Sequence, residues 1–204
     1  TLVEGIRRQC DVLGFEINPY AALACQVKLE ALYHSPVSIR QAAERIERQL
    51  QSHLRRSGER PNSQPPQGFH TRDAFFSPRV EQQVLFAKDL IAAEGEEWLR
   101  RLLCLALGSV MVGVSNYTYE PSLGRRVAAG KGVVADADLP RILRDKLLHM
   151  AHDVETWQMG RERERRRPRS CVFNESYLTG AASRLTEGLV NVLITSPPYL
   201  NNYH

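Results

Sequence analysis

Near the C-terminal end of the chain, two consecutive prolines follow an apolar run. Residues 190–195 read VNVLIT, a pattern typical of a buried strand, and Ser196, Pro197, Pro198 and Tyr199 come directly after it. Prolines donate no backbone hydrogen bond and hold φ near one value, so a strand must end there. We therefore predict a rigid, extended loop at the carboxyl end of a strand, the edge at which open α/β sheets bind ligands.

A second strand is predicted near the N-terminal end. Residues 11–17 form a short apolar run that indicates a buried parallel strand with Glu16 at its end. Asn18 then provides a helix N-cap and Pro19 a proline at the first helical position, so a mostly apolar helix should follow at once. Glu16 alone is equally compatible with a nucleotide ribose contact and with a plain acid beside a helix N-terminus.

The pattern along the chain predicts an α/β core interrupted by helices. With 204 residues, of which 43% are hydrophobic and 25% charged, the chain can form one ordinary domain with an appended lobe. We expect residues 1–35 to begin the core, residues 36–168 to form a mostly helical insertion with a flexible or extended linker near 57–68, and residues 169–204 to return to the core. Apolar spacing predicts helices within 1–9, 37–56, 77–93, 95–117 and 136–167, and a further strand at SCVF, residues 170–173.

Composition argues against several classes of function. No apolar run reaches membrane-spanning length and the N-terminal residues lack the order of a signal peptide, so we expect a cytoplasmic protein without a membrane partner. The four cysteines include no CxxC pair and are expected to be buried, and His149 and His152 lack an arranged Glu or Cys partner. No metal site is therefore expected. A net charge of +4 suits a polyanionic partner.

Two segments carry a family resemblance. GFEINPYAALACQVK, residues 14–28, resembles the segment after the first glycine-rich loop of class I S-adenosylmethionine-dependent DNA methyltransferases, and TSPPY, residues 195–199, resembles the catalytic tetrapeptide of their amino-methylating branch. The form with serine first is most similar to N4-cytosine enzymes, whereas adenine-N6 enzymes more often carry Asp or Asn there. TLVEGIRR also resembles the helix after the glycine-rich loop. The resemblance implies a partial Rossmann-like parallel sheet with a large helical insertion.

The resemblance assigns a role to each residue of the proline loop. Ser196 Oγ and the carbonyl oxygen of Pro197 would accept the hydrogens of the target amino group, and Pro198 would help to hold that carbonyl in place. Tyr199 would stack on the base. The partner implied is double-stranded DNA with the target base flipped out of the helix, because the amino group is otherwise paired.

The implied cofactor is S-adenosylmethionine. Glu16 would accept hydrogen bonds from the ribose hydroxyls, Ile17 would pack on the adenine, and Asn174 or Glu175 would contact the adenine amino group, although NESY departs from the usual Gly-Asp pair. Cofactor contacts are thus expected from Thr1, Glu16, Ile17, Asn18, Asn174 and Glu175, with Thr1 near the methionine moiety. The family's first strand and glycine-rich loop would precede Thr1 and further strands would follow Tyr199, so we expect an incomplete fragment that is inactive alone.

DNA contacts are expected from a basic, glycine-rich loop that contains Arg125, Arg126 and Lys131. Residues 161–169 alternate Arg with Glu, which fits a solvated helix end as well as a phosphate contact. Two alternatives remain at this point. One is a methyltransferase with another target, such as adenine N6, RNA or protein. The other is a non-catalytic nucleic-acid-binding remnant attached to a decayed core.

Overall fold

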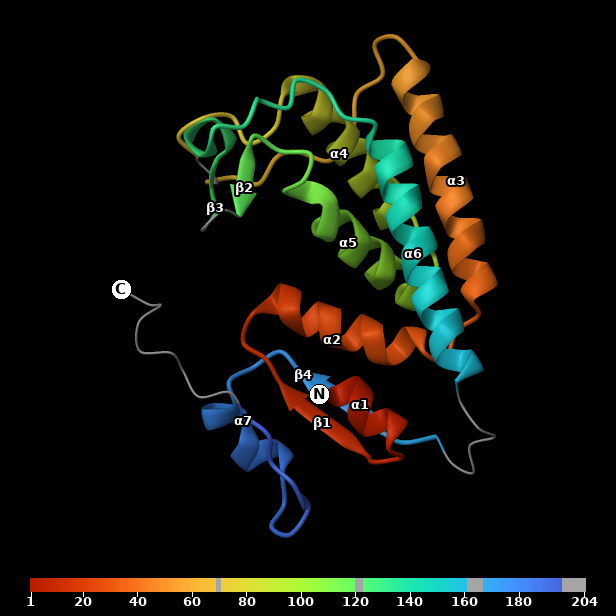
Figure 1. Cartoon of the computed structure of the whole chain (residues 1–204), viewed down its shortest axis with the longest axis vertical. Helices are drawn as coiled ribbons and strands as arrows, with labels where there is room; N and C mark the ends of the chain where they lie inside the picture. Colours follow the sequence, from red (N-terminus) through yellow and green to blue (C-terminus); the bar gives the residue numbers. More distant parts are fainter. Residues whose placement is uncertain (69–70, 120–122, 161–166, 196–204) are drawn as a thin grey trace.

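A helical lobe packs over a small parallel sheet in the computed structural model, which describes residues 1–68, 71–119, 123–160 and 167–195 (Figure 1). In chain order the elements are α1 (Leu2–Arg7), β1 (Val12–Phe15), α2 (Pro19–Ala31), α3 (Pro36–Arg55), α4 (Pro78–Ala92), α5 (Glu97–Met111), β2 (Tyr117–Tyr119), β3 (Leu123–Arg125), the 3-10 helix η1 (Arg126–Ala129), α6 (Leu139–Met159), β4 (Ser170–Phe173) and α7 (Tyr177–Arg184).

The sheet consists of β1 and β4, which run parallel. Val12 pairs with Ser170 and Phe15 with Phe173, so the two strands end at the same level. Both strands lie where the sequence predicts them. The structure confirms a mixed class of helices with a small parallel sheet. The helical lobe leaves the sheet after β1 and α2 and returns to it at β4, so it is inserted between two neighbouring strands.

Helices cover both faces of this sheet. On one face, Gly14 of β1 lies so close to α1 that a Cβ there would stand 2.9 Å from Leu2 Cδ1. On the other face, the ring of Tyr177 in α7 meets the ring of Phe15 edge-on at a centroid distance of 5.4 Å. Successive strand residues point to opposite faces, so one four-residue strand serves both contacts.

The start of α2 confirms the predicted cap. The side-chain oxygen of Asn18 accepts hydrogen bonds from the backbone N–H of Tyr20 at 2.9 Å and of Ala21 at 3.2 Å. Pro19 occupies the first turn, where its missing N–H costs nothing. The cap fixes the direction in which the chain leaves the end of β1, and thereby holds Glu16 and Ile17 in a tight connection between strand and helix.

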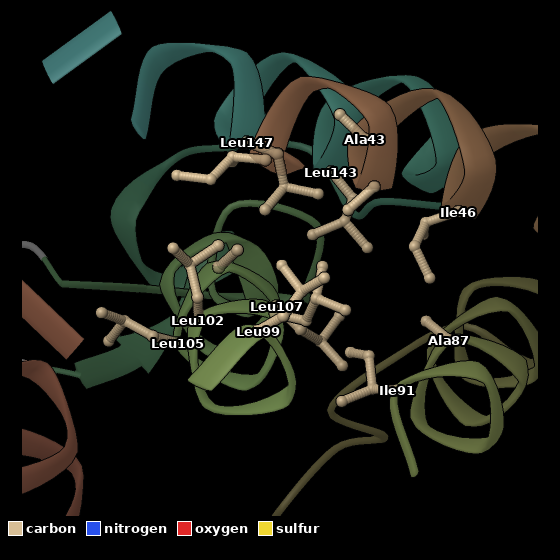
Figure 2. Packing of buried hydrophobic residues seen from close by; sticks show 14 of the residues in the cluster. Ala43, Ile46, Ala87, Ile91, Leu99, Leu102, Leu105, Leu107, Leu143 and Leu147 are labelled. Carbon is tan, nitrogen blue, oxygen red and sulfur yellow. The ribbon is translucent and has the colours of Figure 1, made fainter. Parts of the chain in front are cut away.

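The larger hydrophobic core lies between α3, α4, α5 and α6 (Figure 2), and Val27 and Ala31 of α2 also belong to it. Apolar residues at three-to-four spacing bring one face of α3 against α6, and the side chains of Ile46, Leu143 and Leu147 are almost wholly excluded from solvent. Arg144 of α6 also pairs with Glu47 of α3 at 3.2 Å. In the described part of the chain, no helix has the length and apolar character that a membrane crossing requires.

Residues 57–68 form neither helix nor strand, and they lie along α4. The carboxylate of Asp89 in α4 accepts hydrogen bonds from the backbone N–H of Asn62 at 2.6 Å and of Ser63 at 2.8 Å. Burial raises the pKa of Asp89, but the hydrogen bonds from Ser63 and Asn62 outweigh it and bring the pKa below its ordinary value of 3.8. Lys88 and Gln82 of α4 also donate to the carbonyl oxygens of Gln64 at 3.4 Å and Glu59 at 3.3 Å, so the segment is fastened to the lobe at several points, of which Asp89 is the one with two hydrogen bonds.

Replacing Asp89 with asparagine should release this segment. The variant loses the charge that strengthens both hydrogen bonds, and we expect faster cleavage between residues 57 and 68 in limited proteolysis. Because the folded-state pKa lies below the unfolded value, the carboxylate stabilises the wild type above pH 4 or so and loses this effect as the pH falls through the folded pKa. Cleavage at the same rate in both proteins at neutral pH would contradict this assignment.

The predicted strand at 190–195 is wrong. These residues form no strand in the structure and pair with neither β1 nor β4, and the side chains of Val192, Leu193 and Ile194 are mostly exposed. Strand propensity reports how well a side chain fits a pleated, half-buried surface. In the described structure no such surface lies against this run, so its apolar pattern alone does not make a strand.

Candidate functional site

The carboxyl ends of β1 and β4 bring three of the predicted site residues together. The backbone N–H of Glu16 donates to the carbonyl oxygen of Phe173 at 3.0 Å. The side-chain amide of Asn174 in turn donates to the carbonyl oxygens of Glu16 at 2.8 Å and Ile17 at 3.3 Å. Asn174 therefore ties the two strand ends to each other, and it holds Glu16 and Ile17 at one edge of the sheet.

The carboxylate of Glu16 lies at the N-terminal end of α2. Its Oε1 accepts a hydrogen bond from the backbone N–H of Asn18 at 2.8 Å, which stabilises the connection between β1 and α2. No group in the described residues donates a hydrogen bond to the other carboxylate oxygen of Glu16, Oε2. The side chain of Ile17 beside it is 72% exposed. The edge thus offers a negative acceptor next to an open apolar surface.

Thr1 lies at the same edge of the sheet because α1 runs antiparallel to β1. A Cβ on Gly5 would stand 2.5 Å from Val12 Cγ1, whereas Leu2 lies against Gly14, nearer the end of the strand. Thr1, the N-cap of α1, therefore lies toward the carboxyl end of β1. This position is compatible with the contact that the sequence predicts for Thr1.

Glu175 is engaged elsewhere. Its carboxylate accepts a hydrogen bond from Arg184 Nε at 2.9 Å and packs against Gly180 of α7, where a Cβ would stand 2.6 Å from Glu175 Cδ. The guanidinium of Arg184 also lies 4.7 Å from the centroid of the Phe173 ring. Of the two neighbouring candidates, Asn174 lies beside Glu16, and Glu175 forms an ion pair that fastens α7 to its preceding loop.

The predicted catalytic residues lie outside the described part of the chain. Ser196, Pro197, Pro198 and Tyr199 belong to the segment 196–204, so their position relative to Glu16 stays a prediction. The described residues that lead to them, 189–195, are exposed.

The three predicted DNA contacts share the β2–β3 hairpin surface and the turn after it. Arg125 Nη1 forms an ion pair with Asp73 Oδ2 at 3.0 Å. Arg126 Nε donates to the carbonyl oxygen of Gly132 at 2.9 Å, and Lys131 Nζ to Thr118 Oγ1 at 3.4 Å. In its described residues, the predicted loop contains β3, which pairs with β2, and the 3-10 helix η1. Arg169, at the far end of the second basic run, pairs with Asp11 at 3.2 Å beside the sheet.

The structure corrects the expectation that the cysteines are buried. Cys10, Cys104 and Cys171 are exposed because they lie in a turn, on the outer side of α5 and at the start of β4, and Cys25 is half-buried. Across the described ranges, no group of three or more His, Cys, Asp or Glu side chains is arranged as metal ligands.

One residue beside the site carried no sequence signal. Tyr20 lies in the first turn of α2, and its hydroxyl donates to the carbonyl oxygen of Leu105 in α5 at 3.3 Å. Nothing in the sequence links Tyr20 with Leu105, because their contact depends on how the lobe packs on α2.

Comparisons of this chain with family models, with curated proteins and with solved structures gave no match.

Proposed function

We propose that this chain belongs to an S-adenosylmethionine-dependent DNA methyltransferase that acts on the exocyclic N4 of cytosine. The observation that carries the proposal is the Glu16 carboxylate at the end of β1, held beside the end of β4 by Asn174. A carboxylate at such a strand end has only acceptors, which suits a pair of ribose hydroxyls. The sequence TSPPY supplies the second half of the proposal.

The layers around the sheet support a Rossmann-like core. α1 and α2 contribute to one apolar cluster that includes Val12 and Val172, whereas α7 lies against Phe15 and Phe173 on the opposite face. Helices on both faces of a parallel sheet are the arrangement of doubly wound α/β folds. In such folds ligands bind outside the carboxyl ends of the strands, which is where Glu16 lies.

The residues at this edge fit the cofactor. Glu16 would bind the ribose hydroxyls through its carboxylate, and Ile17 would pack on the adenine ring through its exposed side chain. Asn174 would keep both in position through its bonds to their carbonyl oxygens. When bound, S-adenosylmethionine supplies an electrophilic methyl group on a sulfonium.

The chemistry explains why the proline loop suits an amino group. The lone pair of an exocyclic amine is delocalised into the base, so the amine is a poor nucleophile until acceptors hold it in a reactive geometry. We assign this role to Ser196 Oγ and the Pro197 carbonyl oxygen, with Tyr199 stacking on the flipped base. Serine is a weak base, so the amine proton would pass to solvent after methyl transfer, and Ser196 would act by positioning.

One observation favours a second candidate, a non-catalytic nucleic-acid-binding remnant. The exposed run at 190–195 is not part of the sheet, whereas the helices of the lobe are well packed around the larger hydrophobic core. A remnant would retain DNA binding and lack cofactor binding.

Cofactor binding tests the proposal. Equilibrium dialysis with radiolabelled S-adenosylmethionine would use this chain and an extended version that adds whatever flanking sequence its gene encodes. We expect saturable, one-to-one binding to the extended version that unlabelled S-adenosylhomocysteine displaces. Absence of saturable binding to either protein would refute the proposed function.

A further inference from the structure

A cleft lies where the end of α3 meets the beginnings of α4 and α6. Its volume is about 440 Å³, which suits a small organic molecule. Its lining comes from the last turns of α3, the first turns of α4 and the residues that lead into α6. Figure 1 shows that α3 ends and α6 begins on the side of the lobe away from the sheet. The cleft is therefore separate from the edge that holds Glu16.

Hydrogen bonds fix the wall that α4 and the residues before α6 form. The side chain of Gln83 in α4 lines the cleft, and the residue is only 3% exposed. Its nitrogen donates to Asp136 Oδ1 at 3.3 Å, and its oxygen accepts from the backbone N–H of Leu139 at 3.1 Å. Arg79 Nε forms an ion pair with Asp136 Oδ2 at 3.2 Å. Both oxygens of Asp136 are thus engaged, and a buried polar side chain holds this wall in place.

Two other charged residues of the cleft keep unused hydrogen-bonding capacity. Arg55, at the end of α3, forms no hydrogen bond or ion pair with any residue that the structure describes. Asp138 caps α6 through Oδ1, which accepts from the backbone N–H of Arg141 at 3.3 Å, and within the described ranges its Oδ2 has no donor. A guanidinium and a carboxylate therefore line one space without pairing with each other.

Apolar surface lies beside each of these two charges. Leu54 precedes Arg55 in α3, and Ala137 and Pro140 lie on either side of Asp138 in the sequence. All three line the cleft. The cleft thus combines a cation, an anion and an apolar surface.

This combination favours a zwitterion with an apolar side chain as the occupant. A ligand with only a negative charge would be repelled by Asp138, and a ligand with only a positive charge would be repelled by Arg55. A guanidinium binds a carboxylate through parallel hydrogen bonds, and a carboxylate oxygen accepts from an ammonium group. An α-amino acid carries both groups on one carbon, so it can satisfy both walls at once.

We propose that the cleft between α3, α4 and α6 binds a free α-amino acid with an apolar side chain. Arg55 binds the carboxylate of the ligand and Asp138 binds its ammonium group. Leu54, Ala137 and Pro140 contact its side chain. This inference goes beyond the proposed methyltransferase function and does not rest on it, because it uses no residue at the ends of β1 and β4.

Isothermal titration calorimetry of the whole chain with L-leucine tests this site. Two related probes each lack one charge: L-leucinamide lacks the carboxylate, and isocaproate lacks the ammonium group. We expect saturable, one-to-one binding of L-leucine and about tenfold weaker binding of either related probe, because hydrogen bonds between charged groups are stronger than those between neutral ones.

Two substitutions identify which residue meets which charge. Arg55→Gln should weaken L-leucine binding about tenfold and remove its advantage over L-leucinamide, because the partner of the carboxylate is lost. Asp138→Asn should remove the advantage of L-leucine over isocaproate. Asparagine caps a helix as well as aspartate does, so this variant should keep α6 intact. A merely structural role of either residue would lower the affinity for all three probes alike.

Two matched substitutions serve as controls. Arg48→Gln and Asp153→Asn each remove one exposed charge, from α3 and α6 respectively, and neither residue lines the cleft. Both variants should bind the three probes like the wild type, and circular dichroism melting of every variant checks folding.

Three outcomes would overturn the site. They are absence of L-leucine binding to the wild type, equal binding of the three probes, and unchanged L-leucine affinity in a folded Arg55→Gln variant. None of them alters the result expected for S-adenosylmethionine in dialysis, so the amino-acid site and the proposed function can fail separately.

Discussion

Replacing Glu16 with glutamine in the extended protein is expected to weaken S-adenosylmethionine binding by about 10- to 100-fold. Hydrogen bonds to a charged acceptor contribute roughly 1.5–3 kcal/mol each, and glutamine replaces one acceptor oxygen with an amide group that meets the ribose hydroxyls less favourably. The glutamine side-chain oxygen can still accept from the backbone N–H of Asn18, which Glu16 Oε1 does at 2.8 Å. The variant should therefore fold normally, and equilibrium dialysis measures the change.

The matched control for this variant is Glu187→Gln. It removes the same charge from an exposed acid after α7 and should leave the affinity unchanged. Equal affinity of Glu16→Gln and the wild type would show that Glu16 only stabilises the turn between β1 and α2.

Replacing Leu143 with alanine is expected to lower the free energy of unfolding by roughly 3 kcal/mol, within the range of 2–5 kcal/mol for buried leucines. Leu143 of α6 is fully buried in the lobe core, among residues from α3, α4 and α5 (Figure 2). The substitution loses apolar contacts and leaves a cavity that a close-packed interior fills only in part. Urea denaturation followed by circular dichroism measures the loss.

Leu54→Ala provides the comparison, since Leu54 is 36% exposed near the end of α3. Its replacement should cost less than about 1 kcal/mol, because exposed sites tolerate substitution. Similar losses at the two positions would contradict the assignment of Leu143 to the core.

Local signals made much of the fold predictable. The apolar spacing of α3, α4, α5 and α6 is visible in the sequence, and so is the cap formed by Asn18 with Pro19. The strand at residues 170–173 was also predictable from its apolar residues, and its parallel pairing with β1 follows from the α/β pattern. The edge that holds Glu16 follows from that pairing.

Features that depend on packing at a distance were not predictable. Residues 190–195 have the composition of a strand, but a strand also needs a neighbouring edge, and that need is invisible in the segment itself. Glu175 and Asn174 are adjacent in the sequence, yet only Asn174 reaches the end of β1. The contacts of Tyr20 with Leu105 and Gly108 depend on the antiparallel packing of α5 on α2.

In the proposed methyltransferase, different parts of the fold would bind the cofactor and contact DNA. The connection between β1 and α2, which is fixed by local hydrogen bonds, would hold the cofactor, and the hairpin of the inserted lobe would contact DNA. The close fit of Tyr20 against Gly108 joins the two parts. An insertion between neighbouring strands can in this way extend the binding surface without disturbing the strand ends.

The measurement that bears most directly on the proposed function is the identity of the methylated nucleoside. The extended protein would be incubated with radiolabelled S-adenosylmethionine and mixed-sequence DNA, and the DNA digested to nucleosides for separation. We predict label in N4-methylcytosine, and none when Ser196 is replaced with alanine. Label in N6-methyladenine would contradict the assignment of the base, and absence of label from DNA would contradict DNA methylation as the function.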